Sequence, residues 1–159
     1  AELLTGLGTF RGTGRRFELK GTVHGVRVID DYGHHPTEIH VTLEAARRFA
    51  DAGRLIVIFQ PHRYSRTKAF AAQFASELNL ADRAILLEVY AASEKPIDGV
   101  SSRLITSMMT KGEYIPNFVE VTDSVVADAQ PGDVIMTLGA GDVSSLAPII
   151  VEGLSRRFE

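Results

Sequence analysis

The chain has 159 residues, of which 45% are hydrophobic and 23% are charged, a composition typical of one α/β domain with a buried core. It contains no cysteine, which excludes disulfides, thiolate zinc sites and a cysteine nucleophile. No apolar run approaches the roughly 20 residues that a membrane-spanning helix needs, and the first residues do not resemble a signal peptide. We therefore expect a cytoplasmic protein with no membrane partner.

Basic residues gather in the first half of the chain. Residues 1–70 carry 11 basic and 7 acidic side chains, whereas residues 71–159 carry 6 and 13. A basic half in a chain of net charge −3 favours anionic small molecules or phosphates as ligands. The isoelectric point near 6.0 and the absence of tryptophan argue against a nucleic-acid partner.

The first predicted elements are a hairpin and an amphipathic helix. Two short β-like runs, 17–23 and 26–31, flank the two-residue link His24-Gly25, which suits a tight hairpin turn. Pro36 stands where a first helical residue would. The apolar residues that follow at helical spacing are Ile39, Leu43, Ala46 and Phe49, and Gly53 is the expected helix stop. The glycine-rich residues 1–16 predict a linker, or the end of a preceding domain, ahead of a domain over 17–159.

Helices and buried strands alternate through the rest of the chain. Strands are predicted over 55–60, 84–89, 118–121 and 134–138. Helices are predicted after a cap at Ser65 or Thr67, over 101–110, over 124–129, and from Val143 to Leu154. The stripe of Phe70, Phe74 and Leu78 is expected in the core. Continuous apolar strands between helices predict a three-layer, Rossmann-like, mostly parallel sheet with helices on both faces and the hairpin as an antiparallel edge.

Four polar clusters directly follow predicted strands, at residues 30–35, 60–66, 90–94 and 139–142. In open parallel sheets, ligands bind beyond the carboxyl ends of the strands. The sequence therefore predicts one site built from these four loops.

The cluster after the first central strand admits more than one interpretation. The carboxylates of Asp30 and Asp31 suit ribose hydroxyls, and the nearby imidazoles suit an anionic substrate. The alternative is an acidic strand end followed by a capped helix start. A metal site is disfavoured, because the spacing of His34, His35, Glu38 and His40 matches no standard ligand set.

The next cluster places His62, Arg63 and Arg66 at the start of a helix. Two guanidiniums three residues apart beside a helix N-terminus form a clamp for a carboxylate or phosphate. Cations are unfavourable for the helix at that end, which argues against a purely structural role. A solvated basic surface is the alternative.

The glycine-rich turn at Gly139-Ala-Gly141 partly matches a dinucleotide-binding fingerprint. Ser144 replaces the third glycine and no second βαβ unit follows, so we expect a tight turn whose backbone N–H groups face the site. Arg15-Arg16 is open to two interpretations, a contact with a neighbouring domain or a solvated pair.

These loops closely resemble the C-terminal domain of the Mur ligases. The resemblance rests on 30–38 (DDYGHHPTE), 60–67 (QPHRYSRT), 89–92 (VYAA) and 139–142 (GAGD), and residues 12–17 resemble the segment that joins this domain to the central one. The PHRYSRT stretch favours the branch that adds L-alanine. Ser93 departs from the pattern, since glycine is expected after Tyr-Ala-Ala.

The resemblance implies a reaction and a role for each loop. The whole enzyme would use ATP and Mg²⁺ to phosphorylate the lactyl carboxylate of UDP-N-acetylmuramate, and the amine of L-alanine would attack the acyl phosphate. Arg63, Arg66 and His34 would have catalytic roles, with Tyr32 and His62 completing the alanine pocket. Asp31 and Asp30 would contact the ATP ribose, and Gly139 and Gly141 would offer backbone groups. The metal ligands are expected mainly on the central domain, which together with the N-terminal domain would be this domain's partner.

A second class of function also fits, a stand-alone module that binds a nucleotide or anion without catalysis. The chain contains no GxxxxGK[ST] phosphate loop, so we expect this isolated chain to fold but to lack ligase activity.

Overall fold

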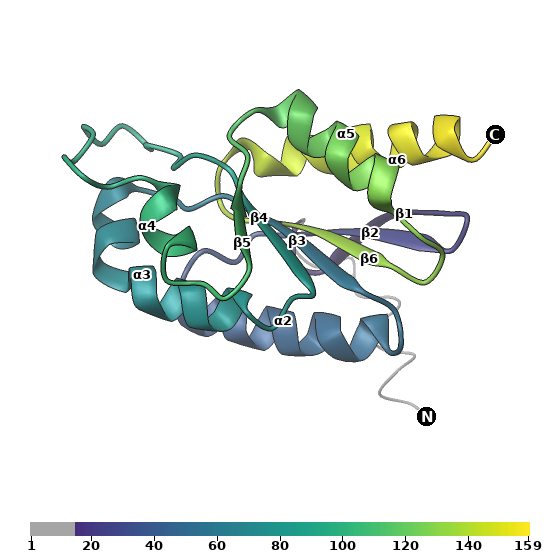
Figure 1. Ribbon diagram of the computed structural model, residues 1–159, viewed down its shortest axis with the longest axis horizontal. Coiled ribbons are helices and arrows are strands. Elements are labelled where there is room, and N and C mark those ends of the chain that lie inside the picture. Colours follow the sequence, from purple (N-terminus) through teal and green to yellow (C-terminus); the bar gives the residue numbers. More distant parts are fainter. Residues whose placement is uncertain (1–14) are drawn as a thin grey trace.

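Residues 15–159 are described by the structure, a computed structural model (Figure 1). In this part of the chain a six-stranded sheet has the order β1-β2-β6-β3-β4-β5. Only β1 runs antiparallel to its neighbour, and the other strand pairs are parallel. The strands are β1 (Glu18–Val23), β2 (Val26–Asp31), β3 (Leu55–Phe59), β4 (Arg83–Leu86), β5 (Gly112–Tyr114) and β6 (Val134–Leu138). The predicted linker, residues 1–16, lies almost entirely outside the described residues.

Helices cover both faces of the sheet, as predicted. They are α2 (Pro36–Ala50), α3 (Tyr64–Leu78), α4 (Ser102–Thr106), α5 (Phe118–Asp128) and α6 (Leu146–Arg157), with a short 3₁₀ helix η1 (Asp142–Ser145) before α6. Figure 1 shows α2, α3 and α4 on one side of the sheet and α5 and α6 on the other. None of the helices within 15–159 has both the length and the apolarity required to cross a membrane.

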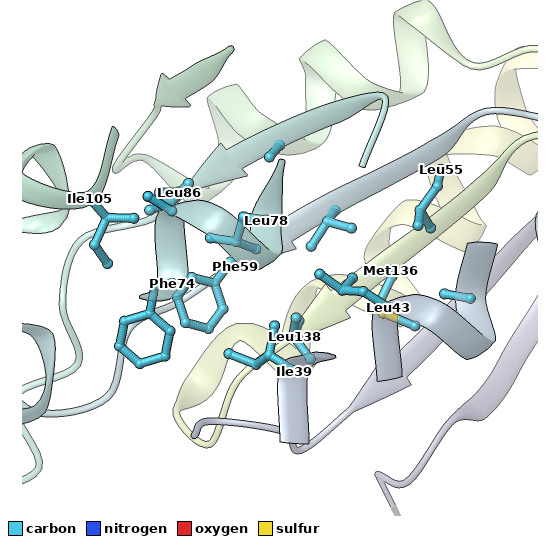
Figure 2. Close-up of a cluster of buried hydrophobic side chains, with 14 of the residues drawn as sticks. Ile39, Leu43, Leu55, Phe59, Phe74, Leu78, Leu86, Ile105, Met136 and Leu138 are labelled. Carbon is cyan, nitrogen blue, oxygen red and sulfur yellow. The ribbon is translucent and has the colours of Figure 1, made fainter. Parts of the chain in front are cut away.

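The central strand β3 shows how the sheet divides the core. Leu55, Val57 and Phe59 pack with α2 and α3 in the cluster drawn in Figure 2. Ile56 and Ile58 point the other way and pack with α5 and α6. Because successive side chains of a strand alternate between faces, a strand covered on both sides must be apolar throughout. Each such side chain contributes about 1.5–3 kcal/mol when fully buried.

The predicted hairpin and helix start are confirmed. His24 and Gly25 have φ values of 48° and 80°, the two positive angles of the type I′ turn that matches the twist of paired strands. Helix α2 begins at Pro36 behind His35, which caps it together with Glu38. The predicted buried stripe differs at one position, because Phe49 is 37% exposed and Ala50 is buried instead.

The predicted strand at 118–121 is wrong, because these residues form the first turn of α5. Asn117 caps this helix by accepting a hydrogen bond from the Glu120 N–H at 3.0 Å, and Val121 and Val125 are buried one turn apart. The cap and the helical spacing outweigh the β propensity of the valines. The edge strand is instead β5, which is too short and too polar to give a strand pattern.

Other predicted boundaries shift by a few residues. The helix expected over 101–110 covers only Ser102–Thr106, and the strand expected over 84–89 ends at Leu86. Helix α3 begins at Tyr64, before either predicted cap, and its N-cap residue Arg63 makes no side-chain cap hydrogen bond. The apolar stripe predicted for the last helix is confirmed, because its four residues are all buried: Val143, Leu146, Ile150 and Leu154. Val143 lies in η1, ahead of α6.

The carboxyl ends of the central strands lie level with one another. Asp31 is paired with Leu138, which in turn is paired with Phe59. The helices that follow β3 and β6 cover opposite faces of the sheet. Neighbouring strands whose connections leave toward opposite faces mark the place where α/β sheets bind ligands.

Candidate functional site

The loop after β2 is held by a buried aspartate. Asp31 Oδ1 accepts hydrogen bonds from the Gly33 N–H at 2.8 Å and from the Thr42 hydroxyl at 3.3 Å. Its Oδ2 accepts from the Phe17 N–H at 2.9 Å, and the residue is only 7% exposed. Asp31 therefore fixes both its own loop and the segment ahead of β1.

A second aspartate, Asp30, is fully buried and ties three segments together. Its carboxylate accepts from the Thr137 hydroxyl at 2.7 Å and from Arg15 Nε at 3.0 Å. Arg15 also donates from Nη2 to the Gly139 carbonyl at 2.5 Å, and its guanidinium lies 5.2 Å from the ring centre of Tyr32. The structure thus gives Arg15 contacts within this domain, at the centre of the loops after β2 and β6.

Tyr32, His34 and His62 form a line of rings across the first two loops. The rings of Tyr32 and His34 meet edge to face at 5.0 Å, and those of His34 and His62 lie 5.8 Å apart. His34 Nδ1 lies 3.1 Å from the Tyr32 carbonyl oxygen. Tyr32 is 42% exposed, so this line of rings borders solvent and can meet a ligand.

The two other histidines of this region, His35 and His40, have contacts outside the line of rings. His35 Nδ1 accepts a hydrogen bond from the Thr37 N–H at 3.2 Å as the cap of α2, so the capped helix start, which was the alternative interpretation of this cluster, is present. His40 bridges to Glu77 of α3, with Nδ1 and Oε2 2.6 Å apart. Within residues 15–159 no three His, Asp or Glu side chains come together as a metal-ligand set.

His62 is held between Tyr90 and Arg66. Its ring stacks on that of Tyr90 at 5.6 Å and 13°, and Arg66 Nη1 lies 3.3 Å from His62 Nδ1. Burial first, and then the positive charge of Arg66, lowers the pKa of His62. A neutral ring that accepts from Arg66 at Nδ1 carries its proton at Nε2, where it can donate to a ligand.

Arg63 occupies the N-cap of α3 with an unusual backbone. Its φ of 71° lies in the left-handed region, which a residue with a side chain enters at a cost of about 1–3 kcal/mol. The side chain is exposed, and within residues 15–159 its guanidinium makes no hydrogen bond or close ion pair, although its charge acts on nearby Glu94 and His62. A strained backbone that presents an unpaired guanidinium beside Arg66 is typical of a ligand-binding position.

The loop after β6 approaches the others closely because it lacks side chains. Gly139 has φ of 142°, and a Cβ there would lie 2.7 Å from the Gln60 carbonyl oxygen. A Cβ on Gly141 would lie 2.7 Å from Cγ of Tyr90. The Gly139 N–H donates to the Asp31 carbonyl at 3.1 Å. This N–H therefore extends the pairing of β6 with β2, and the expectation that it faces the site is wrong.

Sequence reasoning did not assign roles to several residues of this region. Gln60 links two loops, since its Nε2 donates to Asp142 at 2.7 Å and its Oε1 accepts from the Val143 N–H at 3.0 Å. Glu94 accepts from the Ser65 N–H at 3.0 Å, at the first turn of α3. The only sequence signal for these residues is their place within the four polar clusters.

A family model described as "Mur ligase, glutamate ligase domain" matches residues 15–141. The chain belongs to the Mur ligase family. The resemblance inferred from the four loops is thereby confirmed, and so is the predicted fold.

Two curated relatives of this Mur ligase domain carry the same name. The domain is 52% identical over 162 residues to the UDP-N-acetylmuramate–L-alanine ligase of Mycobacterium ulcerans, covering 99% of this chain and 33% of that protein. The corresponding ligase of Paenarthrobacter aurescens is 51% identical over 148 residues, covering 93% of this chain and 32% of that protein. The chain therefore spans about a third of the length of the relatives it matches.

Two solved structures share the fold of this domain. UDP-N-acetylmuramate–alanine ligase MurC of Thermotoga maritima superposes with a TM-score of 0.76 at 29% identity, over 99% of this chain and 34% of that one. MurF ligase of the same organism, in complex with ADP, has a TM-score of 0.71 at 17% identity over 98% of this chain and 36% of that one, and shares the fold.

Proposed function

We propose that this Mur ligase domain is part of an ATP-dependent ligase that adds L-alanine to UDP-N-acetylmuramate, and that it holds the amino acid. The observation that carries the proposal is the basic start of α3, where Arg66 contacts the ring of His62 next to that of His34, and Arg63 presents an exposed guanidinium. The names of the relatives at 51–52% identity support the choice of substrates. The product is a precursor of peptidoglycan, and we place the reaction in the cytoplasm.

The proposed reaction has two steps. The lactyl carboxylate of UDP-N-acetylmuramate takes the γ-phosphoryl group of ATP, which releases ADP. The amine of alanine then attacks the acyl phosphate, the C–O bond to phosphate breaks, and an amide, inorganic phosphate and a proton result. Holding the amine against the acyl phosphate contributes several kcal/mol by proximity alone.

The residues of this domain suit the amino-acid half of that chemistry. The unpaired guanidinium of Arg63 binds the alanine carboxylate, and Arg66, oriented by His62, faces the reacting carboxyl group. Fixed positive charge there stabilises the negative charge that grows on oxygen in the tetrahedral transition state. The rings of Tyr32 and His34 border the small pocket for the alanine methyl group.

ATP is the proposed cosubstrate of the full-length ligase, and a divalent metal ion is its proposed cofactor. A neighbour of the same fold, a folylpolyglutamate synthase from Yersinia pestis, was solved with AMPPNP and a manganese ion. Mg²⁺ would neutralise phosphate charge, but residues 15–159 offer no complete ligand set for it, so its ligands are proposed on the other domains. The ribose contact of Asp31 stays a prediction. Its Oδ2 already accepts one hydrogen bond, from the Phe17 N–H, and can accept one more from a ribose hydroxyl. Asp30, being fully buried, is less accessible still.

Kinetics of Arg63→Ala in the full-length ligase test the proposal. Alanine keeps a Cβ, so the backbone at this position changes little while the guanidinium is lost. A charge-assisted hydrogen bond is worth about 1.5–3 kcal/mol, so kcat/KM for L-alanine should fall about 10- to 100-fold. Arg48→Ala, at an exposed arginine of α2, is the matched control and should behave as wild type. Unchanged kinetics in Arg63→Ala would contradict the assignment.

A further inference from the structure

The backbone of Arg63 is fixed on both sides by hydrogen bonds. Its N–H donates to the Tyr90 carbonyl at 2.8 Å. Its carbonyl accepts from both the N–H and the hydroxyl of Thr67, at 3.1 and 2.8 Å. These contacts set the position of the N-cap and close the first turn of α3, which carries Arg66, but they leave the Tyr64 and Ser65 N–H groups of that turn without an acceptor inside the helix.

That turn is restrained from outside the helix by Glu94. Its Oε2 accepts from the Ser65 N–H at 3.0 Å, and its Oε1 accepts from the Ser65 hydroxyl. These two hydrogen bonds, together with the positive charge of Arg63, lower the pKa of Glu94 and keep it ionised. The carboxylate therefore lies at the positive end of α3, which has no side-chain cap of its own.

The segment that carries Glu94 is shaped for this contact. Ala92 and Ser93 have φ values of 50° and 70°, two consecutive residues with side chains in the left-handed region. The Glu94 N–H closes the turn by donating to the Ala91 carbonyl at 3.0 Å. The long connection from β4 to α4, visible beside α3 and α4 in Figure 1, is thereby tied to the first turn of α3.

We propose that Glu94 is a positioning residue, which holds the first turn of α3 and through it the directions in which Arg63 and Arg66 point. It also occupies the N–H groups of that turn, so the alanine carboxylate binds to the guanidiniums and not to the helix terminus. This inference rests on the proposed function, because the orientation of the Arg63 and Arg66 side chains affects catalysis only if they bind a substrate.

Steady-state kinetics of the full-length ligase, with each substrate varied in turn, test this role. Glu94→Ala should raise KM for L-alanine about 5- to 30-fold, whereas KM for ATP and for UDP-N-acetylmuramate should stay within twofold of wild type. Glu94→Gln keeps one acceptor oxygen and should give an intermediate KM. Asp98→Asn, an exposed acid of the same connection, is the matched control and should leave all three constants unchanged.

Several outcomes would overturn the proposal. If Glu94→Ala lowers kcat alone, Glu94 only supports folding, because a smaller active fraction changes kcat and leaves every KM as it was. An equal rise in all three KM values, or no change in any of them, would refute it too.

If Glu94→Ala does not fold, Glu94→Gln and Ser65→Ala provide the same test, and both must raise KM for L-alanine selectively. A wild-type protein that does not ligate alanine would refute the proposed function, whereas a normal wild type with unchanged variants refutes only the role of Glu94.

Discussion

Replacing Asp31 by asparagine should destabilise this domain, whether or not ATP is present. An amide has one acceptor oxygen, which can take the place of Oδ1 and keep the Gly33 N–H and the Thr42 hydroxyl satisfied. Its NH₂ group must then face the Phe17 N–H, which in the wild type donates to Oδ2 at 2.9 Å. The new NH₂ group and the Phe17 N–H are both donors, so neither has an acceptor. Because Asp31 is only 7% exposed, water cannot easily take that place.

The magnitude follows from these contacts. A buried donor left without an acceptor costs about 1–3 kcal/mol. The remaining hydrogen bonds then go to a neutral amide oxygen and no longer to a charged carboxylate, which adds about 1 kcal/mol. We therefore expect a loss of about 2–4 kcal/mol from a total of about 5–15 kcal/mol, so the variant still folds. With a urea m-value of about 2 kcal/mol/M, the midpoint should fall by about 1–2 M.

Equilibrium urea unfolding of the 159-residue chain, followed by circular dichroism, measures this shift. Asp123→Asn replaces an exposed acid of α5 and should stay within about 0.5 kcal/mol of wild type. A change of less than about 0.5 kcal/mol in Asp31→Asn would refute the reasoning.

Three further changes test other parts of the structure. Ser93→Gly should raise the free energy of unfolding by about 0.5–1 kcal/mol because glycine accepts the φ of 70° without strain, and a lower Tm than that of Ser93→Ala would contradict this. The hydrogen bond from His40 to Glu77 raises the pKa of His40 from its ordinary value of 6.5, so its stabilising effect is complete below that pH and disappears as the pH rises through the raised pKa. The urea midpoints of wild type and His40→Gln should therefore differ more at pH 5.5 than at pH 8.5, and an equal difference would exclude the ion pair as the cause. Gly141→Ala should lower stability by about 1–3 kcal/mol in thermal unfolding, since the new Cβ would clash with Oε1 of Gln60 and lie 2.7 Å from Cγ of Tyr90, and an unchanged Tm would show that both side chains move aside freely.

The expectations that held are those that depend on short-range patterns. His24-Gly25 provides the positive φ values of a tight turn, and Pro36 follows a capping residue, so both features could be predicted locally. The failure at Phe118–Val121 is of the opposite kind. The β-branched residues there suggest a strand, but burial of Val121 and Val125 against the sheet selects a helix.

The site divides in the same way. Its residue types and its place after the strands could be predicted, because parallel strands bring their carboxyl ends to one edge of the sheet. The partners of each side chain could not. Gln60 binds Asp142 across 82 positions of sequence, and Asp30 binds the hydroxyl of Thr137 across 107.

By itself, the sequence determined the family, the layered sheet and the four loops, because turn residues, apolar runs and cap residues act over a few neighbouring positions. Only the tertiary structure decided which charged groups are used internally and which are exposed to a ligand. Asp31 and Glu94 are held by N–H groups of other segments, whereas the guanidinium of Arg63 finds no partner among residues 15–159. The physical reason is that burial and hydrogen-bond pairing depend on segments far apart in the chain, which meet only when the sheet forms.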